Sequence, residues 1–130
     1  MAKELIIVDT CVLIRAFRKD REASLILQKS QLQIAISAIT TLELYFGAKT
    51  VAKKNIVKQL VGSYYSIPLS PAISEKAVQL MHDYVSGNRV VSVPDCLIAA
   101  TSIITGFPLL TFNTRDFEFI EGLQLLERPF

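Results

Sequence analysis

The 130-residue sequence contains few of the residue types on which several common enzyme chemistries depend. It has one histidine and two cysteines, and neither Cys11 nor Cys96 belongs to a CxxC pair. A structural disulfide and a zinc site are therefore not supported, and both thiols are expected to be free and buried. The histidine, His82, lies within a predicted helix, which favours a helix-surface or partly packed position over a catalytic role.

Several diagnostic motifs are also absent from the sequence. It contains no GxxxxGK[ST] phosphate loop, no GxGxxG dinucleotide fingerprint and no GxSxG nucleophile elbow. No apolar run approaches the roughly 20 residues that cross a bilayer. The N-terminus lacks the features of a secretory signal. We therefore expect a cytoplasmic protein that does not interact with a membrane.

The composition is that of a folded domain with a substantial core. Hydrophobic residues make up 51% of the chain and charged residues 20%, which excludes disorder and predicts one domain over residues 1–130. The net charge is only +2, so overall charge does not identify a nucleic-acid partner. Basic residues do form two clusters, which are Arg15, Arg18, Lys19 and Arg21, and Lys49, Lys53, Lys54 and Lys58. For a single cluster, a solvated helix face is the more common explanation than a phosphate-binding surface.

Strand and helix patterns alternate along the chain, with no internal repeat or flexible linker. Strands are predicted over residues 4–8, 32–37, 65–69, 108–112 and 123–127. Helices are predicted over 11–17, 21–28, from about 40, and over 50–61, 70–86 and 95–105. This alternation favours an α/β fold with a parallel sheet and helices on both of its faces.

The residue types at the helix ends predict where several helices begin and stop. Thr40 and Glu43 have the T-x-x-E spacing of a capping box. Ser70 is suited to cap the helix that follows it. Asp95 is expected to open the next helix, and Gly106 to end it. The apolar face of the 70–86 helix is predicted to contain Ile73, Ala77, Leu80, Tyr84 and Val85.

Four acidic residues fall where parallel strands are predicted to end. Asp9 directly follows the first strand, and Glu43 lies in the first turn of the helix after the second strand. Asp95 begins a helix, and Asp116 follows the fourth strand. Ligands of open α/β sheets bind outside the carboxyl ends of the strands, so all four acids are candidates for one site.

Each of these acids also has a purely structural explanation. Asp9 and Asp95 are suited to cap their helices, and Glu43 to complete the capping box. Asp116 is suited to an Asx-type turn after Asn113. For any one of them, the structural and functional interpretations have similar weight.

Together, the four acids favour a functional site. Carboxylates that lie a few ångströms apart repel one another at low dielectric and need protons or divalent cations to persist. Ligands that offer only oxygen favour magnesium or manganese over zinc. Because the sequence offers no second histidine and no activated cysteine, the pattern predicts a metal-dependent phosphoryl-transfer site with water as nucleophile.

Four segments of the sequence together resemble the acidic motifs of PIN-domain ribonucleases. They are IIVDTCVLI, ISAITTLEL, PDCLIAATS and LLTFNTRDF. The likeness is greatest to the small single-domain toxins of VapBC-type toxin–antitoxin systems, and it extends over nearly the whole chain. A D-T-x-V-L-I segment alone is a weak signal, but the order and spacing of all four motifs agree.

This resemblance implies a three-layer α/β/α sandwich around a parallel sheet, and RNA cleavage that depends on Mg²⁺ or Mn²⁺. By the same resemblance, Asp9 and Asp95 are the main metal ligands, and Glu43 and Asp116 complete the site directly or through water. It also implies a homodimer and a cognate antitoxin that binds near the active site.

Further residues match the family's motifs or lie close to them. Thr10, Thr111 and Asn113 match polar positions that orient the carboxylates or the water. Arg15 and Arg18, close in sequence to the first acid, are the candidates for contacting the RNA backbone.

The sequence departs from the family's usual pattern at its two cysteines. Cys11 stands where a small polar residue is more common, and its side chain is expected to point away from Asp9. Cys96 replaces a small residue and is expected to pack in the core.

Two other classes of function are alternatives: a different phosphoryl-transfer chemistry, and a protein without catalytic activity. A haloacid-dehalogenase-like phosphatase also places an aspartate after its first strand, but it needs a second aspartate two residues later, where this chain has Cys11. A phosphorylated receiver domain needs an acidic pair after its first strand and a downstream lysine that cannot be placed here. A non-catalytic PIN-like module that binds RNA or protein is the other alternative. The presence of all four acids argues against it, because an unused cluster of like charges only costs stability.

Overall fold

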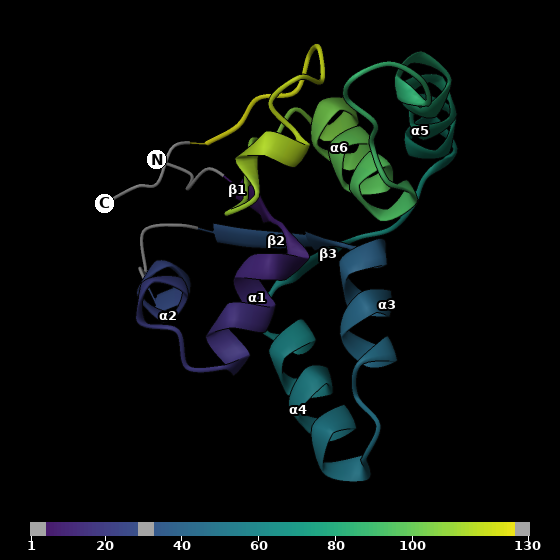
Figure 1. Cartoon of the computed structure of the whole chain (residues 1–130). Coiled ribbons are helices and arrows are strands. Elements are labelled where there is room, and N and C mark those ends of the chain that lie inside the picture. The colour runs from purple at the N-terminus through teal and green to yellow at the C-terminus, as the bar shows by residue number, and fades with distance from the viewer. Residues whose placement is uncertain (1–4, 29–32, 127–130) are drawn as a thin grey trace.

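The computed structural model describes residues 5–28 and 33–126, and strands and helices alternate along them (Figure 1). The elements are β1 (Leu5–Val8), α1 (Thr10–Phe17), α2 (Arg21–Gln28), β2 (Gln33–Ser37), α3 (Ala38–Phe46), α4 (Val51–Gly62), β3 (Tyr65–Ile67), α5 (Pro71–Tyr84), α6 (Val93–Thr105), β4 (Leu109–Leu110) and the 3₁₀ turn η1 (Thr114–Asp116). Residues 4, 32 and 127, which bound three of the predicted strands, lie outside the described residues.

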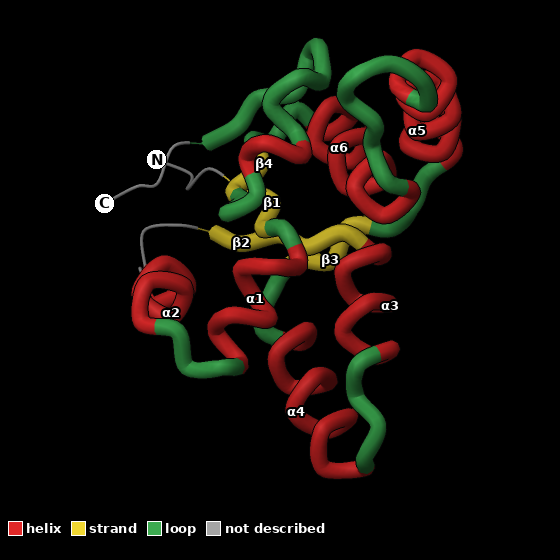
Figure 2. Tube along the Cα trace, viewed as in Figure 1, coloured by secondary structure: helices red, strands yellow, loops and turns green. Residues whose placement is uncertain are grey.

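Within the described residues, the strands form a parallel sheet in the order β3-β2-β1-β4 (Figure 2). β1 lies in the interior of the sheet, where Ile6 pairs with Ile34 and Ile7 pairs with Leu109. Its sequence, LIIV, is continuously apolar because a strand with helices on both faces has no solvent-facing side. The predicted parallel sheet is confirmed.

Helices cover both faces of this sheet. Figure 1 shows α5 and α6 on one side and α1 to α4 on the other. Successive strand residues point to opposite faces, so Ile7 packs with α5 and α6, whereas Ile6 and Val8 pack with α1, α2 and α4. The two hydrophobic clusters are thus separated by the sheet, and the three-layer α/β/α sandwich is confirmed.

Two predicted helix starts were wrong. Ser37, at the end of β2, caps α3 through a hydrogen bond from the Ile39 backbone N–H (3.2 Å), so Thr40 is not the cap. α3 therefore begins at Ala38, and Glu43 falls in its second turn. Likewise, Ser92 rather than Asp95 caps α6. In both places a serine just upstream provides the cap, which leaves the later polar side chains free for other contacts.

Other predicted features of the helices and strands hold in part. Ser70 caps α5 and Gly106 ends α6 in the left-handed conformation (φ 78°), as predicted. On α5, Ile73, Ala77 and Leu80 are buried and Tyr84 packs against the core. Val85 is exposed because the helix ends one residue before it.

The C-terminal strands are shorter than the sequence predicts. β4 spans only Leu109–Leu110, and in place of a fifth strand Leu125 forms an isolated parallel bridge with Leu109. No helix in the described part of the chain combines the length and apolar character that a membrane crossing requires.

Candidate active site

The polar side chains of the site gather at the carboxyl ends of three neighbouring parallel strands. Asp9 follows β1, Thr111 follows β4, and α3 carries Glu43 away from the end of β2. Two hydrogen bonds join these segments: Thr111 to Asp9, and Thr10 to Glu43. The parallel order β2-β1-β4 is what brings residues about 100 positions apart in the sequence to one edge.

Asp9 is the most enclosed of the four predicted acids, with only 4% of its surface exposed. Its Oδ1 accepts a hydrogen bond from the Thr10 backbone N–H (2.8 Å), so it caps α1. Its Oδ2 accepts hydrogen bonds from Thr111 Oγ1 (2.7 Å) and from Cys11 Sγ (3.3 Å). The structural and functional explanations of Asp9 are therefore not exclusive, because the cap also fixes the carboxylate at the edge of the sheet.

Cys11 lies inside this site, and the expectation that its side chain points away from Asp9 was wrong. Its Sγ contacts the Asp9 carboxylate and lies 3.6 Å from Thr111 Oγ1. Burial, and after it the charge of Asp9, raise the pKa of the Cys11 thiol to about 11. The thiol is therefore neutral near pH 7 and donates its proton to Asp9. Cys96, by contrast, is buried in the core as expected, where it donates to the Ala77 carbonyl.

The Thr10 hydroxyl, at the start of α1, contacts two side chains of α3. Thr10 Oγ1 lies 2.8 Å from Glu43 Oε1 and 3.0 Å from Thr40 Oγ1. Both threonines are buried, and Thr40 is completely so. The T-x-x-E spacing that suggested a capping box thus places Thr40 and Glu43 on the same face of α3, directed at Thr10.

Asp95 lies in the first turn of α6, where its backbone N–H donates to Ser92 Oγ (3.2 Å). Partial burial raises the pKa of the Asp95 carboxyl to about 6, and the charge of Asp9 is the next largest cause. Asp116 and Glu43 raise this pKa as well. All three other acids therefore act electrostatically on Asp95, and a bound cation would relieve their combined charge.

Asp116 and Asn113 lie on the exposed side of the site. Asp116 ends η1, and its backbone N–H donates to the Asn113 carbonyl (3.0 Å) in a 3₁₀ turn rather than an Asx turn. The Asn113 backbone N–H in turn donates to Thr111 Oγ1 (3.0 Å). This backbone contact links the exposed turn to the hydroxyl that holds Asp9.

The arrangement is more open than the tight cluster of four acids that the sequence predicts. Within residues 5–28 and 33–126, no group of three or more His, Cys, Asp or Glu side chains is close enough to hold a metal ion. The Asp9 carboxylate accepts a hydrogen bond from the Thr111 hydroxyl, and the Glu43 carboxylate accepts one from a different hydroxyl, that of Thr10. Asp116 lies on an exposed turn. The oxygen donors still fit Mg²⁺, which is usually bound through one or two carboxylates together with water and substrate phosphate.

The two arginines expected to contact RNA have different surroundings. The Arg15 guanidinium lies over the Phe112 ring, 4.5 Å from its centroid, immediately beside Thr111. Arg18 instead lines a pocket of about 470 Å³ between α1, α3 and α4. The remaining lining residues are Ile14, Phe17, Glu43, Leu44, Gly47, Ala48, Lys53, Ile56 and Val57.

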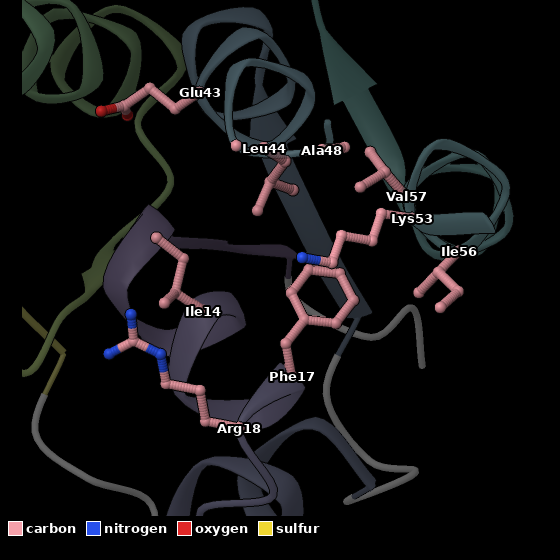
Figure 3. A pocket seen from close by; sticks show the side chains of 10 residues that line it. Ile14, Phe17, Arg18, Glu43, Leu44, Ala48, Lys53, Ile56 and Val57 are labelled. Atoms are coloured by element: carbon pink, nitrogen blue, oxygen red, sulfur yellow. The ribbon is translucent and has the colours of Figure 1, made fainter. Parts of the chain in front are cut away.

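This pocket adjoins the site through Glu43. Figure 3 shows Glu43 at one end of the pocket, with its carboxylate turned away from the apolar side chains that line the rest. Phe17 and Ile56 are substantially exposed there. The pocket cannot be predicted from the sequence, because apolar residues from three helices form it and each helix alone has an ordinary amphipathic pattern.

Comparison with known proteins places these features in a family. A family model described as the PIN domain matches residues 6–122. Ribonuclease VapC10 of Mycobacterium tuberculosis is 31% identical over 122 residues, which cover 92% of this chain and 91% of the relative. Ribonuclease VapC1 of Rickettsia felis is 29% identical over 101 residues, covering 72% and 75%.

Solved structures agree with these relatives. A toxin–antitoxin complex from Klebsiella pneumoniae contains a chain that is 33% identical, with a TM-score of 0.77 and coverage of 91% of this chain and 94% of that chain. The crystal structure of VapBC2 from Rickettsia felis, bound to a DNA fragment from its promoter, matches with a TM-score of 0.81, 22% identity and coverage of 94% and 97%. Because the Rickettsia felis structure is only 22% identical to this chain, its likeness supports the fold alone.

Proposed function

The chain belongs to the PIN-domain family, and on this premise we propose that it is the toxin of a type II toxin–antitoxin system, an endoribonuclease that acts in the cytoplasm. The observation that carries the proposal is the enclosed Asp9 carboxylate, held by Thr111 and Cys11 at the edge where Glu43 and Asp95 also lie. Relatives named as ribonucleases cover nearly the whole chain, which supports the same activity here.

We propose that the site holds Mg²⁺ or Mn²⁺, with Asp9 and Asp95 as the main ligands. Glu43 and Asp116 complete the site directly or through water. A divalent cation bound there supplies charge neutralisation for the phosphate and lowers the pKa of a water molecule. The raised pKa of Asp95, caused by burial and by the neighbouring acids, supports a cation at this position.

The residues of the chain orient the reactants for hydrolysis. Hydrogen bonds from Thr111 and Thr10 hold the Asp9 and Glu43 carboxylates toward the substrate side. Water attacks the phosphorus in line, the bond to the 3′ oxygen breaks, and the products carry a 5′-phosphate and a 3′-hydroxyl. This chemistry does not use the RNA 2′-hydroxyl as nucleophile.

Arg15 is the better candidate for RNA contact, and Arg18 belongs to a different surface. Arg15 is exposed, stacks on Phe112 and lies beside the strand end that carries Thr111. An arginine already held on an aromatic ring loses less freedom when it binds a phosphate. Arg18 lines the apolar pocket instead.

We assign the apolar pocket between α1, α3 and α4 to the cognate antitoxin. Its exposed apolar side chains call for an apolar partner segment, and Arg18 and Lys53 favour acidic side chains on that segment. A segment seated there reaches Glu43 and so approaches the active site. The toxin is expected to be a homodimer, which light scattering of the purified protein would test.

The nuclease proposal is tested by RNA cleavage. Total transfer RNA is incubated with wild type, Asp9→Asn and Asp83→Asn, each with Mg²⁺ and with excess chelator. Asp83 lies on α5, so its variant controls for the same substitution outside the site. Metal-dependent cleavage by wild type and Asp83→Asn, and loss in Asp9→Asn, are expected. Full activity in chelator, or equal activity of Asp9→Asn, would reject a metal-dependent nuclease and favour a non-catalytic binding module or another chemistry.

The antitoxin surface needs a separate test. The chain is co-expressed with its cognate antitoxin, and complex formation is measured for Ile56→Glu and Val78→Glu. Both residues are exposed on helices, but only Ile56 lines the pocket. Loss of the complex is expected for Ile56→Glu alone. Equal binding by both variants would place the antitoxin elsewhere.

A further inference from the structure

Thr40 is a completely buried polar residue that none of the acidic motifs explains. It lies on α3, one turn before Glu43, and its exposed fraction is 0%. Ser37 caps the helix, so Thr40 has no capping role. A buried hydroxyl costs stability unless it forms a hydrogen bond, whereas valine would fill the same volume without that cost. The position therefore has a polar residue for a reason beyond packing.

The hydrogen-bond partner of Thr40 comes from another helix. Its Oγ1 lies 3.0 Å from Thr10 Oγ1, at the start of α1. Thr101 provides a contrast, because it is equally buried but donates to the Leu97 carbonyl one turn earlier in its own helix (2.8 Å). The short hydrogen bond of Thr101 is therefore local, and its second contact, with Ser37 Oγ, is long (3.5 Å). The Thr40 hydroxyl instead joins α3 to α1 at the edge of the site.

The number of available protons determines which of the two threonine hydroxyls, Thr10 or Thr40, is the donor. Thr10 has one hydroxyl proton and lies close to both Thr40 Oγ1 and Glu43 Oε1. An ionised carboxylate only accepts hydrogen bonds, so Thr10 donates to Glu43 and accepts from Thr40. Hydrogen bonds in such a chain polarise one another, so the donation from Thr40 strengthens the donation to the carboxylate.

We propose that Thr40 is a positioning residue for the nuclease site. Its hydroxyl fixes the Thr10 proton on the side of Glu43, and Thr10 then holds the Glu43 carboxylate in one orientation. This inference rests on the proposed function, because it concerns how Glu43 serves that reaction. Thr40 itself touches neither substrate nor metal.

The test removes the hydroxyl without changing the shape of the side chain. In Thr40→Val, kcat for RNA cleavage falls about 10- to 100-fold, as for other groups that orient metal-site ligands, while KM for RNA stays within about twofold. Thr40→Ser restores the hydroxyl and recovers most of the kcat. Thr101→Val, the matched control for a buried threonine, keeps the wild-type kcat.

A double-mutant cycle with Thr10→Val separates positioning from general destabilisation. If Thr40 acts through Thr10, adding Thr40→Val to Thr10→Val causes little further loss of kcat, whereas independent effects multiply. Thermal melting verifies that each variant is folded at the assay temperature. Thr40→Ala, which removes the same hydroxyl, replaces Thr40→Val if the latter does not fold.

The possible outcomes are distinguishable. Wild-type kcat in a folded Thr40→Val or Thr40→Ala variant overturns the inference and leaves the proposed nuclease intact. Loss that Thr40→Ser does not recover, or losses that multiply in the double mutant, also overturn it. A wild type with no metal-dependent cleavage rejects the proposed function itself.

Discussion

Asp9 and Asp116 both follow neighbouring strands of one sheet, but their surroundings differ sharply. Asp9 is 4% exposed and accepts hydrogen bonds from Thr10, Thr111 and Cys11. Asp116 is exposed at the end of a 3₁₀ turn. The term wall is used for a set of buried or half-buried side chains at this edge that hydrogen bonds hold in place: Asp9, Thr10, Thr40, Glu43 and Thr111. We call the exposed pair the rim, consisting of Asn113 and Asp116.

This difference indicates that the wall and the rim have different roles in the site. The wall is built from β1, α1, α3 and the end of β4, so its carboxylates are oriented before any ligand arrives. Orientation in advance is what makes charged groups effective in catalysis, since no reorganisation is needed during the reaction. The two rim residues are exposed on a turn, and their side chains are not enclosed by neighbouring elements of the described chain. The charges of both groups act on Asp95, because Asp9 in the wall and Asp116 in the rim each raise the pKa of its carboxyl.

The largest expected effect separates the two carboxylates directly. If Asp9 is a main ligand, as proposed, Asp9→Asn should lower kcat by about a thousandfold, because its loss would remove several kcal/mol of charge stabilisation by the cation. Asp116→Asn should lower kcat by only about tenfold, since an exposed residue is more easily replaced by water. Steady-state cleavage assays measure both. A greater loss of kcat in Asp116→Asn than in Asp9→Asn would show that the rim carboxylate contributes more to catalysis than the wall carboxylate.

The next largest effect is expected when a hydrogen bond that orients Asp9 is removed. Thr111→Val removes the 2.7 Å hydrogen bond to Asp9 and should lower kcat about 10- to 100-fold, as is usual for groups that orient metal ligands. Thr111→Ser keeps the hydroxyl and should stay close to wild type. Unchanged cleavage by Thr111→Val would show that Asp9 keeps its orientation without this bond.

A smaller effect concerns pH. The pKa of Asp95 in the metal-free fold is about 6, above its ordinary value of 3.8, mainly because of burial. Protonated Asp95 therefore stabilises the metal-free fold below pH 3.8, and this contribution is lost as pH rises through 6. Because a cation must displace that proton, Mg²⁺ affinity should fall about tenfold per pH unit below 6.

The pH prediction is checked by calorimetric titration with Mg²⁺ between pH 5 and 7.5, using Asp95→Asn as the control. The wild type should show the change in affinity, and the variant, which has no proton to lose at this position, should not. An affinity independent of pH in the wild type would indicate that Asp95 does not bind the cation.

The smallest effect is expected at Cys11. Cys11→Ser replaces the S–H donor to Asp9 with an O–H donor, so kcat should change by less than about fivefold, roughly the value of one hydrogen bond. Cys11→Ala removes the donor and should lose somewhat more. A large loss in Cys11→Ser would give the thiol a role that geometry alone does not assign to it.

The sequence predicted the parts of the site that depend on periodicity. The continuous apolar run from Leu5 to Val8 predicts a buried parallel strand, and Asp9 must then follow at its carboxyl end. Thr111 is singled out only by the family resemblance, because the strand predicted over 108–112 includes it, whereas β4 ends at Leu110. The rule that sites form at this edge of a sheet connects positions that are distant in the chain.

The sequence did not predict several contacts that depend on where the helices begin and on how they pack. Asp9 turns back to cap α1, which brings its Oδ2 over the second helical residue, Cys11. The spacing of Thr40 and Glu43 is the same in a capping box as on a shared helix face, and only the position of Ser37 decides between them. These contacts are local and depend on the exact residue at which each helix begins, which a periodic pattern does not define. The Thr10–Glu43 hydrogen bond joins residues from two helices, so a pattern along one segment cannot contain it.

Cation binding tests the central claim most directly, because it needs no knowledge of the RNA target. Calorimetric titration with Mn²⁺ compares wild type, Asp9→Asn and Asp116→Asn at pH 7.5. If the wall holds the cation, Asp9→Asn weakens binding by about 100-fold and Asp116→Asn by about tenfold at most. Equal affinity of wild type and Asp9→Asn would contradict the claim that Asp9 is the principal metal ligand.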